Sequence, residues 1–389
     1  MIRRLPQDLL VVKGAAEQAL APIRPVTDAT DAKRDFLFTA HRSDASCELP
    51  AYYLIYFLLV DLLGFKNLGR FEKISWSVPI DFNGRAFLVE HRKFGVGVFV
   101  QDSATDEIAA KEVVGLINAG VDVAAPFFDW LATQAVKSSK INVTNNSRYL
   151  LGRFDFFLRG YHEKKAETER RKDEVIRKQI SENAWSYSHP SWALNTEANC
   201  LALAAIEAFF SWTEHVFVHI GILEGIVKTV ESIAKLANAD WPTKFRSVID
   251  LSDPESNAFY DKLILIRREH RNFVAHGSFG KQGEAFEFHS SIGAVPVLLP
   301  HKNGKRKFSL GARVTSDDAY AIAVIENFLT HLWSGLRAPA KVYVESDLPT
   351  IVTMASDGSY TRAMNSIEDM EALVTHLSHR FDQAANMDW

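Results

Sequence analysis

The sequence predicts an α+β protein whose C-terminal half is a mainly α-helical bundle with a β-hairpin insertion, preceded by an N-terminal α+β domain. Three observations support this prediction. Strand-like alternation with a tight-turn signal occurs early, apolar helical periodicity dominates from residue 196 onward, and a strand-like stretch interrupts it at about 284–313. A chain of 389 residues is long enough for two or three domains, each with its own core.

Composition places the chain among ordinary globular proteins, with 47% hydrophobic and 24% charged residues. The net charge of −4 argues against a protein that is basic overall, but a local basic patch is sufficient to bind nucleic acid. Cys47 and Cys200 are far apart and lack metal-ligand spacing, so we expect neither a disulfide scaffold nor a cysteine zinc site. Residues 1–20 lack a long apolar run, so we expect no signal peptide and a cytoplasmic location.

Residues 1–147 are predicted to form the α+β domain, whose role the sequence does not indicate. The apolar segment 51–65 falls short of the roughly 20 residues that span a bilayer, so we expect a buried helix and no membrane association. Residues 75–101 alternate like strands around Asn83-Gly84, a dipeptide typical of tight hairpin turns. Residues 106–137 have a helical period that Pro126 is predicted to kink or divide.

Residues 148–195 are predicted to form a long charged helix and a connector. The helix is expected over 148–182, and its second half mixes basic and acidic side chains. Such a pattern is compatible with a ridge that binds the nucleic-acid backbone, but a solvated helix with i,i+4 ion pairs is favoured. The turn-rich and aromatic tract 183–195 is expected to be the connector to the next domain.

Residues 196–336 are predicted to form the helical bundle. Its first helix is apolar nearly all round, which indicates burial among other helices. The remaining helices are expected at 227–237, within 254–276, and from Ser316 onward. Residues 337–389 are predicted to form a C-terminal β-hairpin, with strands 342–345 and 351–354, and a last helix.

The third bundle helix ends in the sequence IRREHRNFVAHG, residues 266–277. In it, Arg271-Asn272 is separated by three residues from His276, and Gly277 provides a helix stop signal. The spacing alone is weak, because Arg85 and His91 show a similar one on a predicted strand. The match at Arg271 and His276 is the better of the two, because it lies at the end of an apolar-periodic helix within a four-helix array.

This segment resembles the R-x(4–6)-H motif of the HEPN family, in its R-polar-x3-H form, and the resemblance covers roughly residues 196–336. It implies a metal-independent endoribonuclease, with RNA as substrate, that acts as a homodimer through its motif helices. His276 would remove the 2′-OH proton, a second His276 would assist the leaving 5′-oxygen, Arg271 would stabilise the phosphorane, and Asn272 would position phosphate or imidazole. The setting expected by analogy is a toxin or an anti-phage defence effector, with a possible separate antitoxin or regulatory partner.

Helix geometry agrees with a site at this place. Arg268, Asn272 and His276 share one face, and Arg267 and Arg271 share the neighbouring face. A structural core would rarely tolerate so many cations, because unpaired buried charges cost several kcal/mol. The helix C-terminus favours an imidazolium while the arginines oppose it, so His276 is expected to titrate near neutrality, as acid–base chemistry requires.

Other residues are assigned supporting roles, each with a structural alternative. Glu207 and Glu214 on the first bundle helix are expected either to orient the arginine or histidine, or to form ordinary interhelical ion pairs. The arginines of the motif helix could also be surface groups paired with Glu269, with His276 as a helix cap. The residues expected to bind substrate are Arg267, Arg268 and the basic hairpin tip Lys302, Lys305, Arg306 and Lys307.

No metal and no cofactor is expected. His215 and His219 have an i,i+4 spacing that suits a metal, but they lack a third ligand and are predicted to be core or interface residues. The alternative function is a non-catalytic, HEPN-like dimerisation or interaction module that binds a nucleotidyltransferase-like or sensor partner. A ligand sensor in the N-terminal domain is a further possibility, for which the sequence indicates no ligand.

Overall fold

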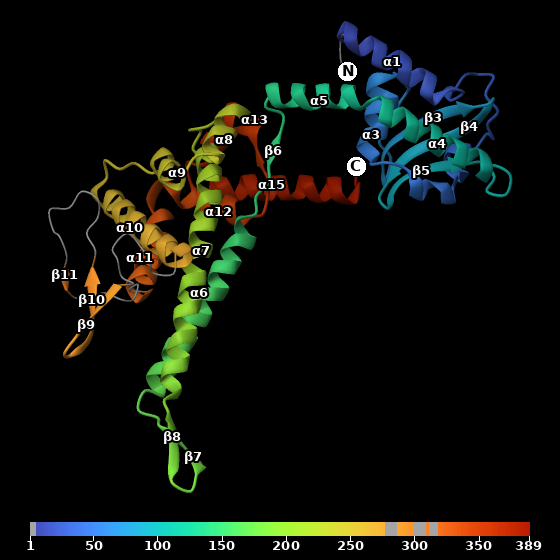
Figure 1. Ribbon diagram of the computed structural model, residues 1–389. Coiled ribbons are helices and arrows are strands. Elements are labelled where there is room, and N and C mark those ends of the chain that lie inside the picture. Colours follow the sequence, from blue (N-terminus) through green and yellow to red (C-terminus); the bar gives the residue numbers. More distant parts are fainter. Residues whose placement is uncertain (1–4, 277–285, 299–308, 311–317) are drawn as a thin grey trace. The chain divides into compact units, whose positions relative to one another are not determined.

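A computed structural model describes residues 5–276, 286–298, 309–310 and 318–389. The chain divides into two compact units, and each is described by itself (Figure 1). Unit 1 comprises residues 1–138 together with 375–389, and unit 2 comprises residues 139–374. Long helices and small antiparallel sheets occur together, so the predicted α+β class is confirmed.

Unit 1 is built on a five-stranded antiparallel sheet in the order β1-β3-β4-β5-β2. The three long strands confirm the strands predicted over 75–101. Asn83 and Gly84 have φ angles of 53° and 83°, which the tight two-residue turn between β3 and β4 requires. The strands are β1 (Arg24–Pro25), β2 (His41–Arg42), β3 (Ile74–Phe82), β4 (Arg85–Arg92) and β5 (Gly95–Val100).

Helices lie on both faces of this sheet: most of them share one core cluster with it, and Phe36 of α2 packs on Ala86, Leu88 and Phe99 of the other face. The segment predicted as a buried core helix forms α3 and a π-helical continuation, and its Ile55, Leu58 and Leu59 are fully buried in the unit 1 core. Pro126 divides the long helical segment as predicted, because α5 begins with this proline in its first turn. The helical segments of unit 1 are α1 (Gln7–Leu20), α2 (Phe36–Thr39), the 3-10 helix Asp44–Glu48, α3 (Tyr52–Tyr56), the π-helical turn Phe57–Leu62, α4 (Glu107–Val123) and α5 (Ala125–Lys137).

The end of the chain completes unit 1. Helix α15 (Ile367–Asn386) begins in unit 2 and ends in unit 1. The indole Nε1 of Trp389 donates to the carbonyl of Ile74, 3.1 Å away, and Lys73 pairs with Asp388. The sequence-based division, which kept residues 337–389 together and apart from residues 1–147, did not foresee this return.

Unit 2 is organised around two long helices, α6 (Ser147–Arg170) and α7 (Pro190–Leu223), which pack along each other (Figure 1). A short hairpin joins them, formed by β7 (Ile176–Ser181) and β8 (Ala184–Ser188). The predicted helix over 148–182 is therefore too long.

The sequence explains where this helix ends. The ion pairs that support the end of α6 are those of Arg171 with Glu167 and of Lys172 with Glu169, and Arg171 also contacts Glu174. Beyond that point β-branched residues favour a strand rather than a helix. The predicted connector 183–195 is also wrong in part, because Pro190 is compatible with a first helical turn and α7 starts there.

The predicted helices of the bundle are confirmed. They are α7, α8 (Val230–Ala237), α10 (Pro254–His276) and α11 (Asp318–Leu332). A further helix, α9 (Trp241–Val248), was not predicted, and α7 packs against α8, α9, α10 and α11. Within the predicted insertion lie β9 (Phe286–Ser290), β10 (Gly293–Leu298) and β11 (Ser309–Leu310), which form an antiparallel sheet. Among the described helices, α7 alone is long and apolar enough to cross a membrane, and 61% of its most apolar window is buried inside the protein.

The predicted C-terminal β-hairpin is wrong. Residues 342–345 belong to α12 (Ala338–Glu345), and residues 352–354 belong to α13 (Val352–Ser356). The helix forms because Pro339 suits a first turn and because Ala340, Tyr343 and Val344 bury one helical face, which overrides the β propensity of the valines. The other elements here are β12 (Thr350–Ile351), which pairs with β6 (Asn142–Val143), the 3-10 turn Gly335–Arg337 and α14 (Ser359–Ala363).

Candidate functional site

The predicted catalytic residues occupy the last two turns of α10. The helix runs without a break from Pro254 and ends at His276, directly before the predicted stop signal. Arg271, Asn272 and His276 therefore share the end of one helix that packs against α7 and α11. Their side chains lie outside the described residues, as do Lys302, Lys305, Arg306 and Lys307 of the predicted basic tip.

Arg267 is held in an ion pair one turn before the motif. Its Nη2 lies 3.0 Å from Oε1 of Glu214 on α7, which is the interhelical ion pair that the sequence offered as the alternative to an orienting role for Glu214. The other oxygen of Glu214 lies 3.5 Å from Nζ of Lys244, a residue of α9 that is only 5% exposed. Glu214 therefore pairs with two cations and links three helices.

Arg268 and Glu207 do not take part in this network. Both are exposed, and neither forms an ion pair within the described part of the chain. The prediction that Glu207 orients an arginine gains no support from the described contacts. Arg268 is the described arginine of the motif helix that remains open to solvent, and its charge is accessible to an anionic ligand.

His270 is a residue that the sequence-based reasoning missed. It is 9% exposed, and neither ring nitrogen has a hydrogen-bond partner within the described residues. Burial lowers the pKa of His270, while the negative charges of Glu207 and Asp318 oppose this shift. The signal was available, because His270 continues the buried stripe of Leu263 and Ile266 at helical spacing.

His215 and His219 are structural. His219 is 1% exposed; its Nδ1 lies 2.6 Å from Oγ1 of Thr350, and its Nε2 lies 3.0 Å from Nε2 of His215. The backbone N–H of Asn146 donates to the same nitrogen of His215, so that nitrogen is unprotonated and accepts. The prediction of core histidines is confirmed, and the described residues include no group of three that could hold a metal.

The match to the motif spacing at Arg85 and His91 is also structural. Arg85 and His91 lie on β4, as predicted. Nε of Arg85 lies 2.8 Å from Oδ1 of the buried Asp106, and this contact raises the pKa of Arg85. The ring of His91 stacks on Tyr52 with a centroid distance of 3.9 Å, and burial lowers its pKa.

Comparison of the chain with protein-family models, with curated proteins and with solved structures found no match. A function for this chain therefore has to be inferred from its own residues and their geometry.

Proposed function

We propose that this protein is a metal-independent endoribonuclease that acts as a homodimer, with Arg271, Asn272 and His276 at its catalytic centre. The position of these residues at the end of α10 carries the proposal. An arginine, a carboxamide and an imidazole on successive turns can bind a phosphate and transfer protons at one place. Arg268 adds a solvent-exposed cation one turn earlier.

The proposed reaction uses the ribose 2′-hydroxyl as the nucleophile. His276 removes its proton while the 2′-oxygen attacks the neighbouring phosphorus, and Arg271 stabilises the negative charge that grows on the phosphorane. The bond to the 5′-oxygen then breaks, and this oxygen takes a proton from the second His276 of the dimer. The products are a 2′,3′-cyclic phosphate and a 5′-hydroxyl, and a strand without 2′-hydroxyls is not cleaved.

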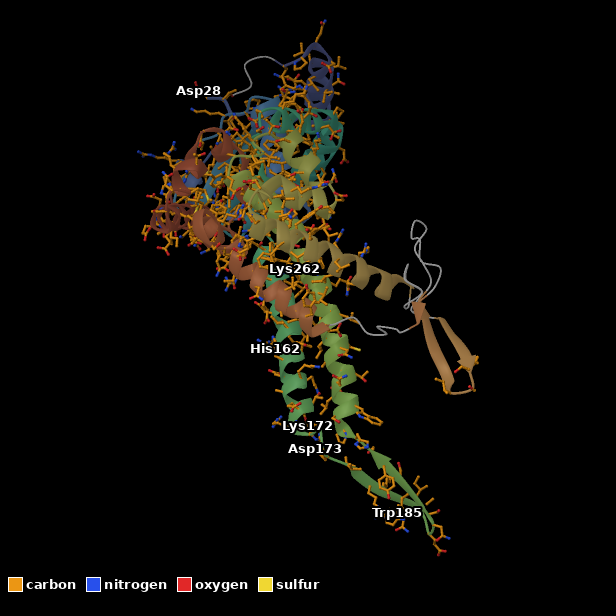
Figure 2. The ribbon with its side chains drawn as sticks, turned by 90° about the vertical axis from the view of Figure 1, so that its left-hand side faces the viewer. Asp28, His162, Lys172, Asp173, Trp185 and Lys262 are labelled. Atoms are coloured by element: carbon orange, nitrogen blue, oxygen red, sulfur yellow. The ribbon has the colours of Figure 1, made fainter. Side chains whose placement is uncertain are left out.

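A second candidate function is a non-catalytic interaction module that binds a partner protein. Two observations favour it. Arg267 is already ion-paired with Glu214, which reduces the number of unpaired cations on α10. In addition, the β7–β8 hairpin exposes apolar side chains beyond the end of α6, near Lys172 and Asp173, and Figure 2 shows Trp185 there. Such an apolar surface suits contact with another protein.

Cleavage of RNA in the presence of EDTA separates the two candidates. We expect the wild-type chain to cleave, and His276→Ala to lose about 10²–10⁴-fold in rate, as is typical when one acid–base group is removed. His379→Ala is the matched control, because His379 is exposed on α15, and we expect it to cleave like the wild type. Cleavage that stops in EDTA and returns with Mg²⁺, or a change under about threefold in His276→Ala, would refute the proposed mechanism.

The proposed setting as a toxin or defence effector has its own test. Expression of the wild-type chain is expected to slow growth and fragment cellular RNA, whereas Arg271→Ala and His276→Ala are expected to do neither. Arg153→Ala, which changes an exposed arginine of α6, is the control. Equal growth inhibition by the wild type and by His276→Ala would indicate the interaction module instead.

A further inference from the structure

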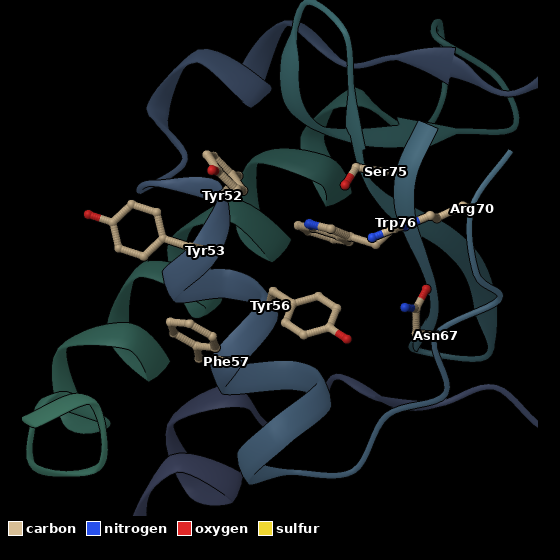
Figure 3. Close-up of a pocket in the computed structure, with 8 residues that line it drawn as sticks. All are labelled: Tyr52, Tyr53, Tyr56, Phe57, Asn67, Arg70, Ser75 and Trp76. Carbon is tan, nitrogen blue, oxygen red and sulfur yellow. The ribbon is translucent and has the colours of Figure 1, made fainter. Parts of the chain in front are cut away.

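Unit 1 contains a pocket between α3 and β3 with a cavity volume of about 290 Å³ (Figure 3). Tyr56 projects from α3 and Trp76 from β3, and Asn67 and Arg70 come from the segment that joins these two elements. The volume is close to the lower end of the range of about 300–1,000 Å³ that is typical of small-molecule sites. The pocket therefore suits one small molecule rather than a folded partner.

Aromatic rings form most of its wall. Trp76 is 5% exposed, and its ring centroid lies 5.6 Å from that of Tyr56. Tyr52 and Tyr53 are about half exposed at the rim, and Phe57 lies beside Tyr53. Such walls favour either a flat ring, which stacks, or a cation, which lies over the ring faces.

Charge decides between these two kinds of ligand. Arg70 is the charged residue of the lining, and it forms no ion pair within the described residues. Its guanidinium lies over the ring of Trp389, 4.0 Å from the ring centroid. A cationic ligand would be repelled there, whereas the planar guanidinium pairs well with a phosphate or a carboxylate.

Asn67 adds a fixed hydrogen-bond donor. Its Oδ1 accepts from the backbone N–H groups of Gly69 and Ser77, at 2.9 and 3.2 Å. These two contacts orient the carboxamide, so its Nδ2 is left to donate to a ligand. A heterocycle with a carbonyl or ring nitrogen on its edge can accept this hydrogen bond, and a plain hydrocarbon ring cannot.

We propose that this pocket binds a nucleotide, with the base against Tyr56 and Trp76 and the phosphate at Arg70. A nucleotide combines the three properties that the lining selects: a flat heterocycle, an acceptor edge and a negative charge. It can be a free mononucleotide or one nucleotide of a single-stranded RNA. The proposal goes beyond the nuclease site of α10 and does not rest on it.

Isothermal titration of the full chain with AMP, CMP, GMP and UMP tests the proposal. We expect at least one of them to bind, and we expect Tyr56→Leu and Arg70→Gln each to weaken its binding about tenfold, the size of one lost stacking or charged contact. Arg24→Gln is the matched control and is expected to bind like the wild type. Arg24 is exposed on β1. In the strand register of the sheet it lies opposite Asp81, at the other end of β3 from Trp76.

Three further titrants distinguish the possible ligands. A short single-stranded RNA that binds more tightly than any mononucleotide, with the same loss in Arg70→Gln, identifies RNA as the source of the nucleotide. Inorganic phosphate and choline are expected to bind at least tenfold more weakly than the best mononucleotide. The proposal is overturned if no nucleotide binds at millimolar concentration, if phosphate or choline binds equally well, or if both variants bind like the wild type. Arg70 is exposed, so Arg70→Gln stays informative even if Tyr56→Leu does not fold.

Discussion

At the scale of single residues, Glu214 is the carboxylate on which the packing around α10 depends. It holds Arg267 and the nearly buried Lys244 at the same time. Loss of this carboxylate would leave a buried ammonium without its partner, which is costlier than the loss of a surface ion pair. The alternative role for Glu214 is in catalysis, through its contact with the motif helix.

Replacement of Glu214 by glutamine separates these two roles. Because Glu214 is itself about one-third exposed, we expect a moderate loss of about 1–2 kcal/mol in the free energy of unfolding, measured with urea. Glu345→Gln, which breaks the exposed pair with Lys341, is the control and should cost less than about 0.5 kcal/mol. A Glu214→Gln chain that keeps its stability but loses cleavage would show that the carboxylate serves the reaction rather than the fold.

Residue-scale prediction succeeded where the signal is local. The course of α10 up to His276 follows from its apolar periodicity. That Arg267 shares the carboxylate of Glu214 with Lys244 could not be predicted, because Lys244 lies on a separate helix, α9. His270 was overlooked although its position on the buried stripe is visible in the sequence.

At the scale of elements, α7 and β12 are joined by buried polar contacts rather than by apolar packing alone. His219 of α7 contacts Thr350 of β12, and its ring is shielded from water. Burial lowers the pKa of His219 to about 3, and the neighbouring His215 contributes to this shift. The network holds only while both imidazoles are neutral, because His215 must accept the N–H of Asn146.

This network makes stability depend on pH in a defined window. Above pH about 6.5, the ordinary pKa of histidine, His219 is neutral in both the folded and unfolded states and has no effect. Between pH about 6.5 and about 3, only the unfolded state binds a proton at His219. The free energy of unfolding therefore falls by about 1.4 kcal/mol for each unit by which the pH is lowered. Glutamine does not titrate, so the free energy of unfolding of His219→Gln is expected to lack this pH dependence. The difference in stability between the variant and the wild type should therefore shrink as the pH falls. His379→Gln serves as the exposed control, and parallel pH profiles for wild type and His219→Gln would contradict the assignment.

Elements were predicted correctly where one period dominates, as in α7, α10 and the β3–β4 hairpin. They were wrong where two signals compete. The charged segment after Arg170 has helix-forming side chains, yet residues 176–181, which include Ile176 and Ile180, form β7 and pair with the aromatic strand β8. In α12 the valines suggest a strand, but the burial of Tyr343 and Val344 on one helical face is decided by tertiary contacts.

At the scale of the whole molecule, the C-terminal residues belong to the same compact unit as the N-terminal residues. Residues 375–389 belong to unit 1, where Trp389 lies beside Arg70 and donates to the backbone of β3. No local feature of the sequence predicts this association of the two chain ends, because it depends on contacts between residues more than 300 positions apart. Ser256 of α10 and His331 of α11 are also far apart in the sequence, and their contact forms only when the chain folds.

The proposed reaction also requires a second copy of the whole molecule. One chain offers a single His276, whereas the proton removal and the leaving group need two imidazoles around one phosphate. A twofold axis supplies the second copy, since the same surface meets itself. We therefore expect the active species to be a homodimer in sedimentation experiments at the concentration of the cleavage assay. Equal amounts of wild-type and His276→Ala chains that mix at random should leave about one quarter of the dimers with two His276. A cleavage rate near one quarter of that of the same total amount of wild-type chain supports the shared cleft, whereas a rate near one half, or full activity from a strictly monomeric chain, contradicts it.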